Sequence, residues 1–442
     1  MTTDVLCLDV GSTFTKAVLV GPDGEVRGTA ETLTTRRTDV LDGCHVLAEE
    51  LGAGSDTTTL ACSSAGGGLR LAVVGYERQV TAEAGYRVGL SAGAKVVHVA
   101  SGRLDASAVK AVGRSLPDLV LLVGGTDGGN SDVLLHNAAQ LARAALGRPV
   151  VVAGNVDAQD EVVALLRGAG QPVRVADNVV PEIGEISPGS ARAAIRATFL
   201  DHVIGGKGLS SSPLFREMVR APTPDAVLRG AEVTAEAIGS DLLVVDVGGA
   251  TTDVYSVVTP EGEDATLRRG VVGTLWHART VEGDLGVRWN AVSVVEAAAR
   301  ERIPVGAALH RYAASVVADP AHLPAGDDER ALDLQLATVA SLVAVRRHGR
   351  PGAPGASPRP LGDVGLVLGS GGVLRHATAE QGMRVLAAVT GDHAGGWRVP
   401  RSARTGVDVA YLLFAVGLLA DWAPGPAGEQ PEVARALARR IV

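Results

Sequence analysis

The stretch DVGSTFTKAVLV, residues 9–20, decides the fold, because it ends a strand on an acid and turns back through Gly11 into a second strand. Glycine permits a tight turn, and the amides of Ser12 and Thr13 can point inward as a nest for an anion. Phosphate is the natural guest of such a nest. Asp9 makes chemical sense there if a hydrated Mg²⁺ lies between the two negative charges. Taken alone, such a turn is more often an ordinary hairpin.

The same pattern returns in the second half of the chain. Residues 6–20 read LCLDVGSTFTKAVLV, and residues 243–257, laid against them without gaps, read LVVDVGGATTDVYSV. This internal repeat predicts two similar half-domains that face one another across a cleft. Asp9 and Asp246 then flank one Mg²⁺, and the two turns hold the β- and γ-phosphates of a nucleotide.

The residues expected to bind the nucleotide lie in these turns and in a third strand–glycine element, GLVLGSGGVLRH at 365–376. They are Gly11, Ser12, Thr13, Lys16, Gly248, Gly249, Ala250, Thr251, Thr252, Gly369, Ser370, Gly371 and Gly372. Glycines in the third element can admit a base or ribose against bare backbone. The expected catalytic residues are Asp246, Asp253 and Asp9, and the expected metal ligands are Asp9 and Asp246.

Five charged residues are candidates for a role in the site, and the sequence alone does not fix the role of any of them. Lys16 and Asp253 occupy equivalent places in the repeat with opposite charge: Lys16 can reach a phosphate and Asp253 can orient water, or both are solvated strand residues. Glu282 and Asp284, in RTVEGDLG, can polarise water or can serve a loop or helix cap. Glu232 is another candidate for positioning water. The sequence leaves the choice among these carboxylates open.

The segment GGTDGGN, residues 124–130, follows a predicted strand and precedes a predicted helix. The helix can be capped by Asn130 or Ser131, so the loop can bind a phosphate or carboxylate at a helix amino end. Alternatively it is a βα turn in which glycines relieve crowding, and Asp127 disfavours an anion. A partner surface is favoured over a second nucleotide site.

Composition indicates a globular protein that does not bind nucleic acid through a broad basic face. Hydrophobic residues make up 46% and charged residues 20% of the 442 residues, with a net charge of −8. The start of the chain has no basic leader, and the apolar run at 409–420 is shorter than the roughly 20 residues of a membrane span. We therefore expect a cytoplasmic protein without a membrane segment.

The three cysteines, Cys7, Cys44 and Cys62, have no C-x-x-C spacing. Cys7 falls inside a strand pattern, where it serves as a small apolar residue. A zinc site or a disulfide is therefore disfavoured.

The pattern of the whole chain predicts an α/β fold. Residues 1–77 form the first half of the core, and residues 78–190 alternate strand and helix as an inserted, doubly wound α/β domain of Rossmann type. A helical connector at 191–240 leads to the second half at 241–442.

The three motifs resemble those of the superfamily of actin, sugar kinases and heat-shock chaperone ATPases. The resemblance covers the two phosphate motifs at 9–20 and 246–257 and the adenosine motif at 366–374. It implies two ribonuclease-H-like halves around ATP, with Asp9 and Asp246 coordinating the water shell of Mg²⁺.

A narrower resemblance involves LLVGGTDGGN at 121–130, DLLVVDVGGATTDVYSV at 241–257, RTVEGDLGVRWNA at 279–291 and YLLFAVGLLA at 411–420. These are similar to the accessory ATPase of coenzyme-B12-dependent glutamate mutase, the methylaspartate mutase reactivating-factor family. The resemblance implies a chaperone-like use of ATP to exchange damaged corrinoid for adenosylcobalamin. The partner would be the B12-binding subunit of the mutase, and cobalamin would be met only there.

Other classes remain to be weighed. A small-molecule kinase would need a substrate pocket with an acidic base, for which no separate motif is visible. An ATPase activator of a radical enzyme would need cysteine ligands for an iron–sulfur cluster. A filament or septum protein would need an amphipathic tail, and EQPEVARALARRIV is short. The mutase served and the oligomeric state, a homo-oligomer included, are left open.

Overall fold

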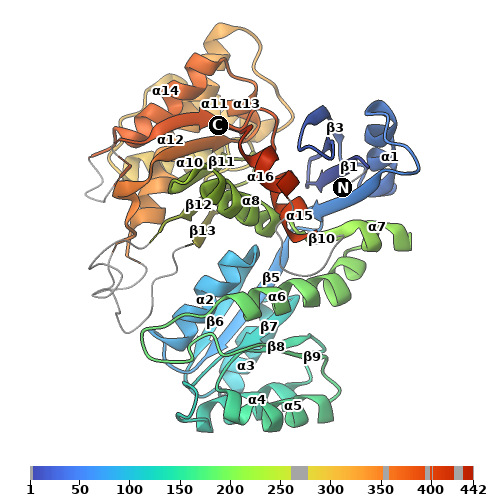
Figure 1. The fold of residues 1–442 in the computed structure, drawn as a ribbon. Coiled ribbons are helices and arrows are strands. Elements are labelled where there is room, and N and C mark those ends of the chain that lie inside the picture. The colour runs from blue at the N-terminus through green and yellow to red at the C-terminus, as the bar shows by residue number, and fades with distance from the viewer. Residues whose placement is uncertain are drawn as a thin grey trace. The chain divides into compact units, whose positions relative to one another are not determined.

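The computed structural model describes residues 3–259, 277–351, 358–393, 399–400, 402–422 and 432–441. The described chain divides into two compact units. The first unit contains residues 3–227 and 421–422, and the second contains the described residues from 228 to 420 and from 432 to 441. Figure 1 labels their helices and strands.

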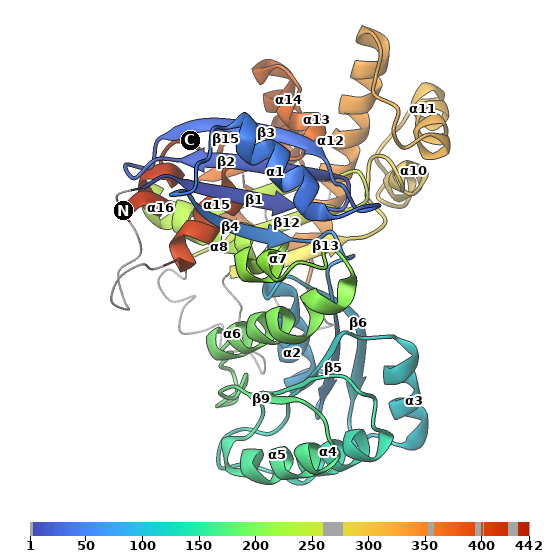
Figure 2. The same cartoon turned by 90° about the vertical axis from the view of Figure 1, so that its right-hand side faces the viewer.

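The first unit contains a five-stranded mixed sheet in the order β10–β4–β1–β2–β3. Its strands are β1 (Val5–Val10), β2 (Phe14–Val20), β3 (Val26–Leu33), β4 (Thr58–Ser63) and β10 (Val219–Pro222). β1 is antiparallel to β2 and parallel to β4. The central strand β1 is buried throughout, whereas exposure alternates along the edge strand β3, as expected when only one face is covered. Helix α1 (Val40–Glu50), capped by Asp39, packs on that face (Figure 2).

A second, all-parallel sheet in the same unit has the order β6–β5–β7–β8–β9. Its strands are β5 (Leu69–Gly75), β6 (Ala94–Ser101), β7 (Leu119–Leu122), β8 (Val150–Val152) and β9 (Val173–Val175). Helices α2 (Thr81–Ser91) and α6 (Gly189–Thr198) share a core with one face. Helices α3 (Ala106–Arg114), α4 (Asp132–Ala144) and α5 (Gln159–Gly168) share a core with the other. This sheet is therefore doubly wound.

The second unit is built on another five-stranded mixed sheet, in the order β13–β12–β11–β14–β15. Its strands are β11 (Leu242–Val247), β12 (Thr252–Val257), β13 (His277–Glu282), β14 (Leu366–Ser370) and β15 (Arg404–Val407). One face shares its core with α10 (Ala291–Arg300), α11 (Ala307–Ala318), α12 (Asp327–Gly349) and α14 (Ala379–Thr390). The short helix α13 (Gly372–Arg375) directly follows β14.

The remaining helices are α7 (Pro213–Met218), α8 (Thr223–Ile238), α15 (Leu413–Asp421) and α16 (Glu432–Ala438). Short turns of 3₁₀ helix occur at Val156–Ala158, Ile204–Lys207 and Leu361–Asp363, and one π turn occurs at Phe199–Val203. Helix α15 is buried along nearly its whole length, in agreement with the apolar run at 409–420. Within the described ranges, no helix is both long and apolar enough to cross a bilayer.

The mixed α/β class expected from the sequence is confirmed. The two mixed sheets also share one strand order, because in each the first hairpin pairs antiparallel and the first strand then pairs in parallel with a later strand. Two elements lie outside the expected segments: β5 precedes residue 78 but joins the parallel sheet, and β10 lies in the expected helical connector. The facing of two half-domains and the domain limits stay predictions.

Candidate functional site

The first turn, residues 11–14, joins β1 to β2. The Gly11 N–H donates to the Phe14 carbonyl at 3.1 Å. A Cβ on Gly11 would lie 2.7 Å from that same carbonyl oxygen, so this position requires glycine. Ser12 and Thr13, at the tip of the turn, are exposed. The sequence therefore folds here into the tight turn that its glycine predicts.

Asp9 lies beside this turn and is 2% exposed. Its Oδ1 accepts a hydrogen bond from the Thr223 hydroxyl at 2.6 Å and lies 3.6 Å from the Cys62 thiol. Burial and the neighbouring Asp9 raise the pKa of Cys62 well above its usual value, so the thiol is neutral. Lys16 Nζ lies 4.0 Å from the other carboxylate oxygen. Asp9 is thus a buried carboxylate held by one hydroxyl and faced by one cation.

The second turn, residues 248–251, repeats this geometry between β11 and β12. The Gly248 N–H donates to the Thr251 carbonyl at 2.9 Å, and a Cβ on Gly248 would lie 2.8 Å from that oxygen. Asp246 is paired across the strands with Asp253, as Asp9 is paired with Lys16. The sequence repeat is therefore a repeat of backbone structure. The residue opposite the acid differs in charge, because it is a lysine in the first copy and an aspartate in the second.

Asp253 belongs to a largely buried charged group on one face of the mixed sheet of the second unit. The Arg279 Nη2 lies 3.3 Å from Asp253 Oδ1, and the Arg279 guanidinium lies 5.7 Å from the centroid of the Tyr255 ring. Burial raises the pKa of Asp253, and the attraction of Arg279 offsets this only in part. Arg279 itself is 6% exposed, and its Nε and Nη1 have no hydrogen-bond partner among the described residues.

The backing loop, residues 283–290, follows β13 and holds the second turn from behind. Its donors to the carbonyls of that turn are Val287 N to Gly248 O at 3.1 Å, Arg288 N and Trp289 N to Gly249 O at 2.9 and 3.0 Å, and Asn290 Nδ2 to Ala250 O at 2.8 Å. A Cβ on Gly286 would lie 2.3 Å from the carbonyl carbon of Ala250. The loop and the turn are therefore in direct backbone contact.

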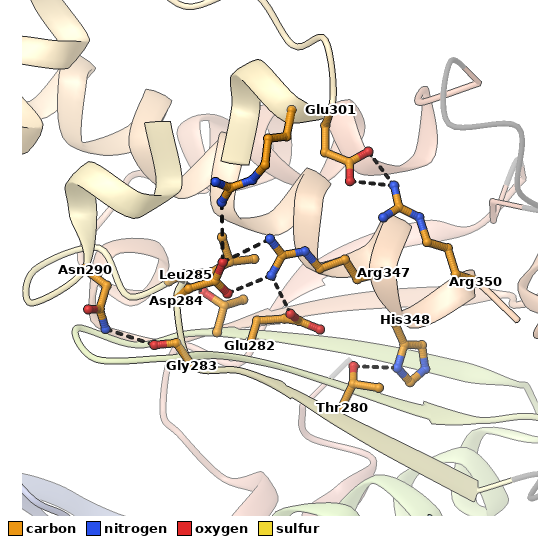
Figure 3. A network of polar contacts seen from close by, with 12 residues as sticks. Thr280, Glu282, Gly283, Asp284, Leu285, Asn290, Glu301, Arg347, His348 and Arg350 are labelled. Atoms are coloured by element: carbon orange, nitrogen blue, oxygen red, sulfur yellow. Dashed lines mark hydrogen bonds and ion pairs between the residues drawn. The ribbon is translucent and has the colours of Figure 1, made fainter. Parts of the chain in front are cut away.

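Helix α12 fixes the backing loop through ion pairs (Figure 3). Arg347 donates to Glu282 at 2.7 Å and to both oxygens of Asp284 at 2.6 and 3.0 Å. These bonds lower the pKa of Asp284, whereas burial raises the pKa of Glu282 despite Arg347. One loop end is also held by Arg288, which pairs with both oxygens of buried Asp333 at 2.6 and 2.9 Å. Glu282 and Asp284 are thus engaged in holding the loop.

The third element is the end of β14 and the start of α13. A Cβ on Gly369 would lie 2.8 Å from a Leu374 methyl, and one on Gly371 would lie 2.1 Å from the Val247 carbonyl oxygen. Gly371 also has φ +98°, in the region that favours glycine. Packing accounts for both glycines. A Cβ on Gly372 would meet nothing within 4 Å, and Ser370 is buried.

Glu232 and the 124–130 loop are both satisfied internally. Glu232 accepts from Arg229 at 3.1 Å and lies 3.2 Å from His277 Nδ1. In the loop, Asp127 accepts from the Asn178 amide at 2.8 Å, and Asn130 accepts from the Asp132 N–H at 2.8 Å.

The loop geometry favours the βα turn. Ser131 makes no capping hydrogen bond with its side chain, so Asn130 is the residue that holds the start of α4. Asp127 also accepts the Val156 N–H at 3.1 Å, which ties the loop to the next βα connection. Its carboxylate therefore has a structural use that requires no ligand.

Each unit gathers its own predicted residues, and reasoning from sequence missed their partners. Thr223, Asp333 and Arg347 carry no motif, and they meet the turns or the backing loop only through tertiary contacts. Arg288 lies in RTVEGDLGVRWNA, but nothing there marks Asp333 as its partner. Arg279 does stand at the start of RTVEGDLG, which was its one available signal. No group of three or more acidic, histidine or cysteine side chains placed to hold a metal occurs within the described residues.

Together the fold and the turns define a mixed α/β protein with two acid–glycine hairpins on sheets of the same strand order. A family model described as MutL protein matches residues 5–432. The Protein MutL of Clostridium tetanomorphum is 35% identical over 457 residues, which cover 96% of this chain and 97% of that relative. The chain therefore belongs to the MutL protein family.

Solved structures also resemble the chain, at low identity. Nucleotide-free acetone carboxylase is 14% identical, with 95% of this chain and 70% of that chain covered and a TM-score of 0.39. The ATP-dependent caprolactamase of Pseudomonas jessenii is 15% identical, with 94% and 70% covered and a TM-score of 0.40.

Proposed function

We propose that this protein binds ATP with Mg²⁺ and hydrolyses it, with the first and second turns holding the phosphates. The observation that carries the proposal is the match between the two turns, in backbone hydrogen bond, required glycine and preceding acid. Backbone amides at such turns bind phosphate oxygens, and they do so without a basic surface. This agrees with the acidic net charge of −8.

The chemistry of the two acids fits a magnesium ion. Mg²⁺ prefers oxygen ligands, keeps several waters and usually takes one or two carboxylates together with substrate phosphates. Asp9 and Asp246 would supply those carboxylates. Asp9 also has a hydroxyl donor at Oδ1, which fixes the orientation of its carboxylate. When bound, the ion would neutralise charge on the phosphates.

Among the acids considered for positioning water, Asp253 has the strongest support. Glu282 and Asp284 are held by Arg347, and Glu232 is held by Arg229 and His277. Asp253 faces Asp246 directly across β11 and β12, and its hydrogen bond from Arg279 is long, at 3.3 Å. A carboxylate with a raised pKa is a better proton acceptor than an ordinary one.

The proposed use of ATP is to exchange corrinoid on a B12-dependent mutase of the glutamate mutase type. Membership of the MutL protein family and the resemblance of the motifs to the reactivating-factor family support this role. The B12-binding subunit would be the partner, and damaged corrinoid would leave it for intact adenosylcobalamin. The three cysteines are buried in the first unit, which does not favour the alternative of an iron–sulfur activator.

The hydrolysis experiment measures phosphate release from Mg-ATP by the purified chain. Asp246→Asn should lower turnover about 100-fold, as loss of one charge-stabilising group at a reacting centre does. Asp328→Asn, at an exposed acid in the first turn of α12, is the matched control and should keep full turnover. Equal turnover in both variants would refute the assignment of Asp246.

The exchange experiment uses mutase loaded with an inactive corrinoid. Release of that corrinoid should require this protein, ATP and Mg²⁺ together, and should fail with Asp246→Asn. If ATP is hydrolysed but no corrinoid leaves, the mutase role is wrong and the ATPase proposal stands.

A further inference from the structure

The first turn of helix α8 contacts two parts of the first unit at once. Thr223, the first residue of α8 and 8% exposed, donates its hydroxyl to Asp9 at 2.6 Å. Asp225, two residues later and fully buried, pairs with Arg196 at 2.5 Å and Arg192 at 3.4 Å. Both arginines lie on α6, the helix that covers one face of the parallel sheet.

The backbone of this turn is also held closely. A Cβ on Gly93, which has φ +75° and lies between α2 and β6, would be 2.8 Å from the Asp225 backbone nitrogen. Because α2 and α6 share one core on the parallel sheet, the first turn of α8 rests on that sheet's helices. A displacement of this turn would therefore be passed to α6 or would break its ion pairs.

Burial makes the second outcome unfavourable. Asp225 has no exposed surface, so separating it from its arginines would leave an uncompensated charge inside the protein. Arg196 also pairs with Asp421. Burial lowers the pKa of Arg196, but Asp225 and Asp421 together outweigh it and raise that pKa above its usual value. Ion pairs of Asp225 thus connect the first turn of α8 to helix α6, and the hydrogen bond from Thr223 connects the same turn to Asp9.

We propose that Thr223 is a positioning residue for Asp9, and that Thr223 and Asp225 together transmit the nucleotide state of Asp9 to helix α6 of the parallel-sheet region. The proposal rests on the proposed ATP binding. A carboxylate that turns toward a hydrated ion must either carry the Thr223 hydroxyl with it or release it. The first event moves the first turn of α8, the second removes a contact that holds it, and the Asp225 ion pairs carry the change to α6.

The test compares hydrogen exchange of the α6 amides, Gly189–Thr198, in the full chain with and without saturating Mg-ATP. Wild type should show a change of exchange rate on adding Mg-ATP. Thr223→Val should weaken Mg-ATP binding about tenfold, as loss of a hydrogen bond to a charged group does, and at saturation should lose the α6 response. Thr223→Ser, which keeps the hydroxyl, should restore both.

The matched control is Thr234→Val on the same helix. Thr234 is fully buried, and its hydroxyl donates to the Gly230 carbonyl of its own helix at 2.7 Å. This variant should keep the α6 response. Circular dichroism and urea unfolding check that each variant is folded. If Thr223→Val does not fold, Thr223→Ala, which also removes the hydroxyl, takes its place in the test.

Two results would overturn the inference. One is an α6 response in Thr223→Val equal to that of wild type at saturation. The other is wild type that binds Mg-ATP with no α6 response. Absence of Mg-ATP binding by wild type is a different result, because it would overturn the proposed function and this inference with it.

Discussion

The first and second turns have the same backbone and different support. In each, a glycine N–H bonds the carbonyl three residues on, and a side chain on that glycine would collide with the same carbonyl. Behind the first turn stands a neutral residue, Thr34, whose hydroxyl donates to Gly11 O at 2.9 Å and whose N–H donates to Thr13 O at 2.8 Å. Behind the second turn stands the backing loop, fixed by charged residues of α12.

The difference shows that the repeat determines the turn but not what holds it. Strand, acid and glycine are present in both copies, so both fold locally alike. The support comes from sequence that is not repeated, namely Thr34, which follows β3, in one unit and residues 282–290 with α12 in the other. We therefore expect changes behind the second turn to cost more than changes behind the first.

The largest effect is expected from Gly286→Ala. Its new methyl would lie 2.3 Å from the Ala250 carbonyl carbon, so the backing loop must move away from the second turn. Overpacking of this kind costs about 1–3 kcal/mol, and because backbone is the obstacle we expect about 3. Urea unfolding and Mg-ATP affinity measure the loss.

Gly283→Ala is the matched control for this change. It lies in the same loop, and a Cβ there would meet nothing within 4 Å. Its stability should stay within about 0.5 kcal/mol of wild type. If both alanine variants behaved alike, close contact between loop and turn could not be what supports the second turn.

Arg347→Met is expected to lower the free energy of unfolding by a smaller amount. The change leaves Glu282 half-buried and without its cation, and it frees both oxygens of Asp284. Removing one partner of a fully buried ion pair costs about 3–5 kcal/mol, and partial solvent exposure here should reduce this to about 1–2. Chemical unfolding measures it.

Arg300→Met serves as the control for Arg347. Arg300 approaches the same Asp284 at 3.8 Å but is 59% exposed in its side chain. Its replacement should change stability by less than about 0.5 kcal/mol. A loss as large as that of Arg347→Met would mean that net charge, rather than the hydrogen-bonded clamp, supports the loop.

Helix α12 also carries a buried histidine that makes stability depend on pH. His348 on α12 is fully buried between Ser256 and Thr280, at 2.9 Å from each hydroxyl. Burial, and then Arg359, lower its pKa well below the usual 6.5. The neutral ring therefore stabilises the fold fully above about pH 6.5, and this contribution falls by up to about 1.4 kcal/mol per pH unit as the pH drops below that value.

Comparison of His348→Gln with wild type at pH 7.5 and 5.5 tests this. The variant should lose less stability than wild type on acidification, because its side chain does not titrate. His310→Gln, at an exposed position of α11, should follow wild type. An unchanged pH slope in His348→Gln would show that other groups cause the acid sensitivity.

Much of this organisation could be predicted from sequence, because local pattern determines it. The repeat at 243–257 gave the second turn and even the cross-strand equivalence of Lys16 and Asp253. The alternation of apolar runs with helical stretches gave the doubly wound parallel sheet. These features need only neighbours a few residues apart, or periodicity along one segment.

The contacts around the turns could not be predicted, because they join distant residues. Thr223 lies 214 residues from Asp9, and Arg347 lies 63 residues from Asp284. Nothing near either residue in sequence marks its partner. Gly369 and Gly371 show a second limit of the sequence. They were expected to bind a nucleotide, but close packing accounts for both, and a sequence does not distinguish a glycine required by packing from one required by a ligand.

The smallest effect is expected at the first turn, from Thr34→Val. The change keeps the shape of the side chain and removes a hydroxyl that bonds Gly11 O at 2.9 Å and lies 3.1 Å from the Thr15 hydroxyl. Loss of a neutral hydrogen bond costs about 1 kcal/mol. The Thr34 N–H to Thr13 O bond remains, so the turn keeps part of its support. Thr29→Val, at an exposed site on β3, the strand that ends just before Thr34, is the control and should be neutral or slightly stabilising in urea unfolding. Should Thr34→Val cost as much as Arg347→Met, neutral and charged support would be equivalent, and the contrast between the two turns would fail.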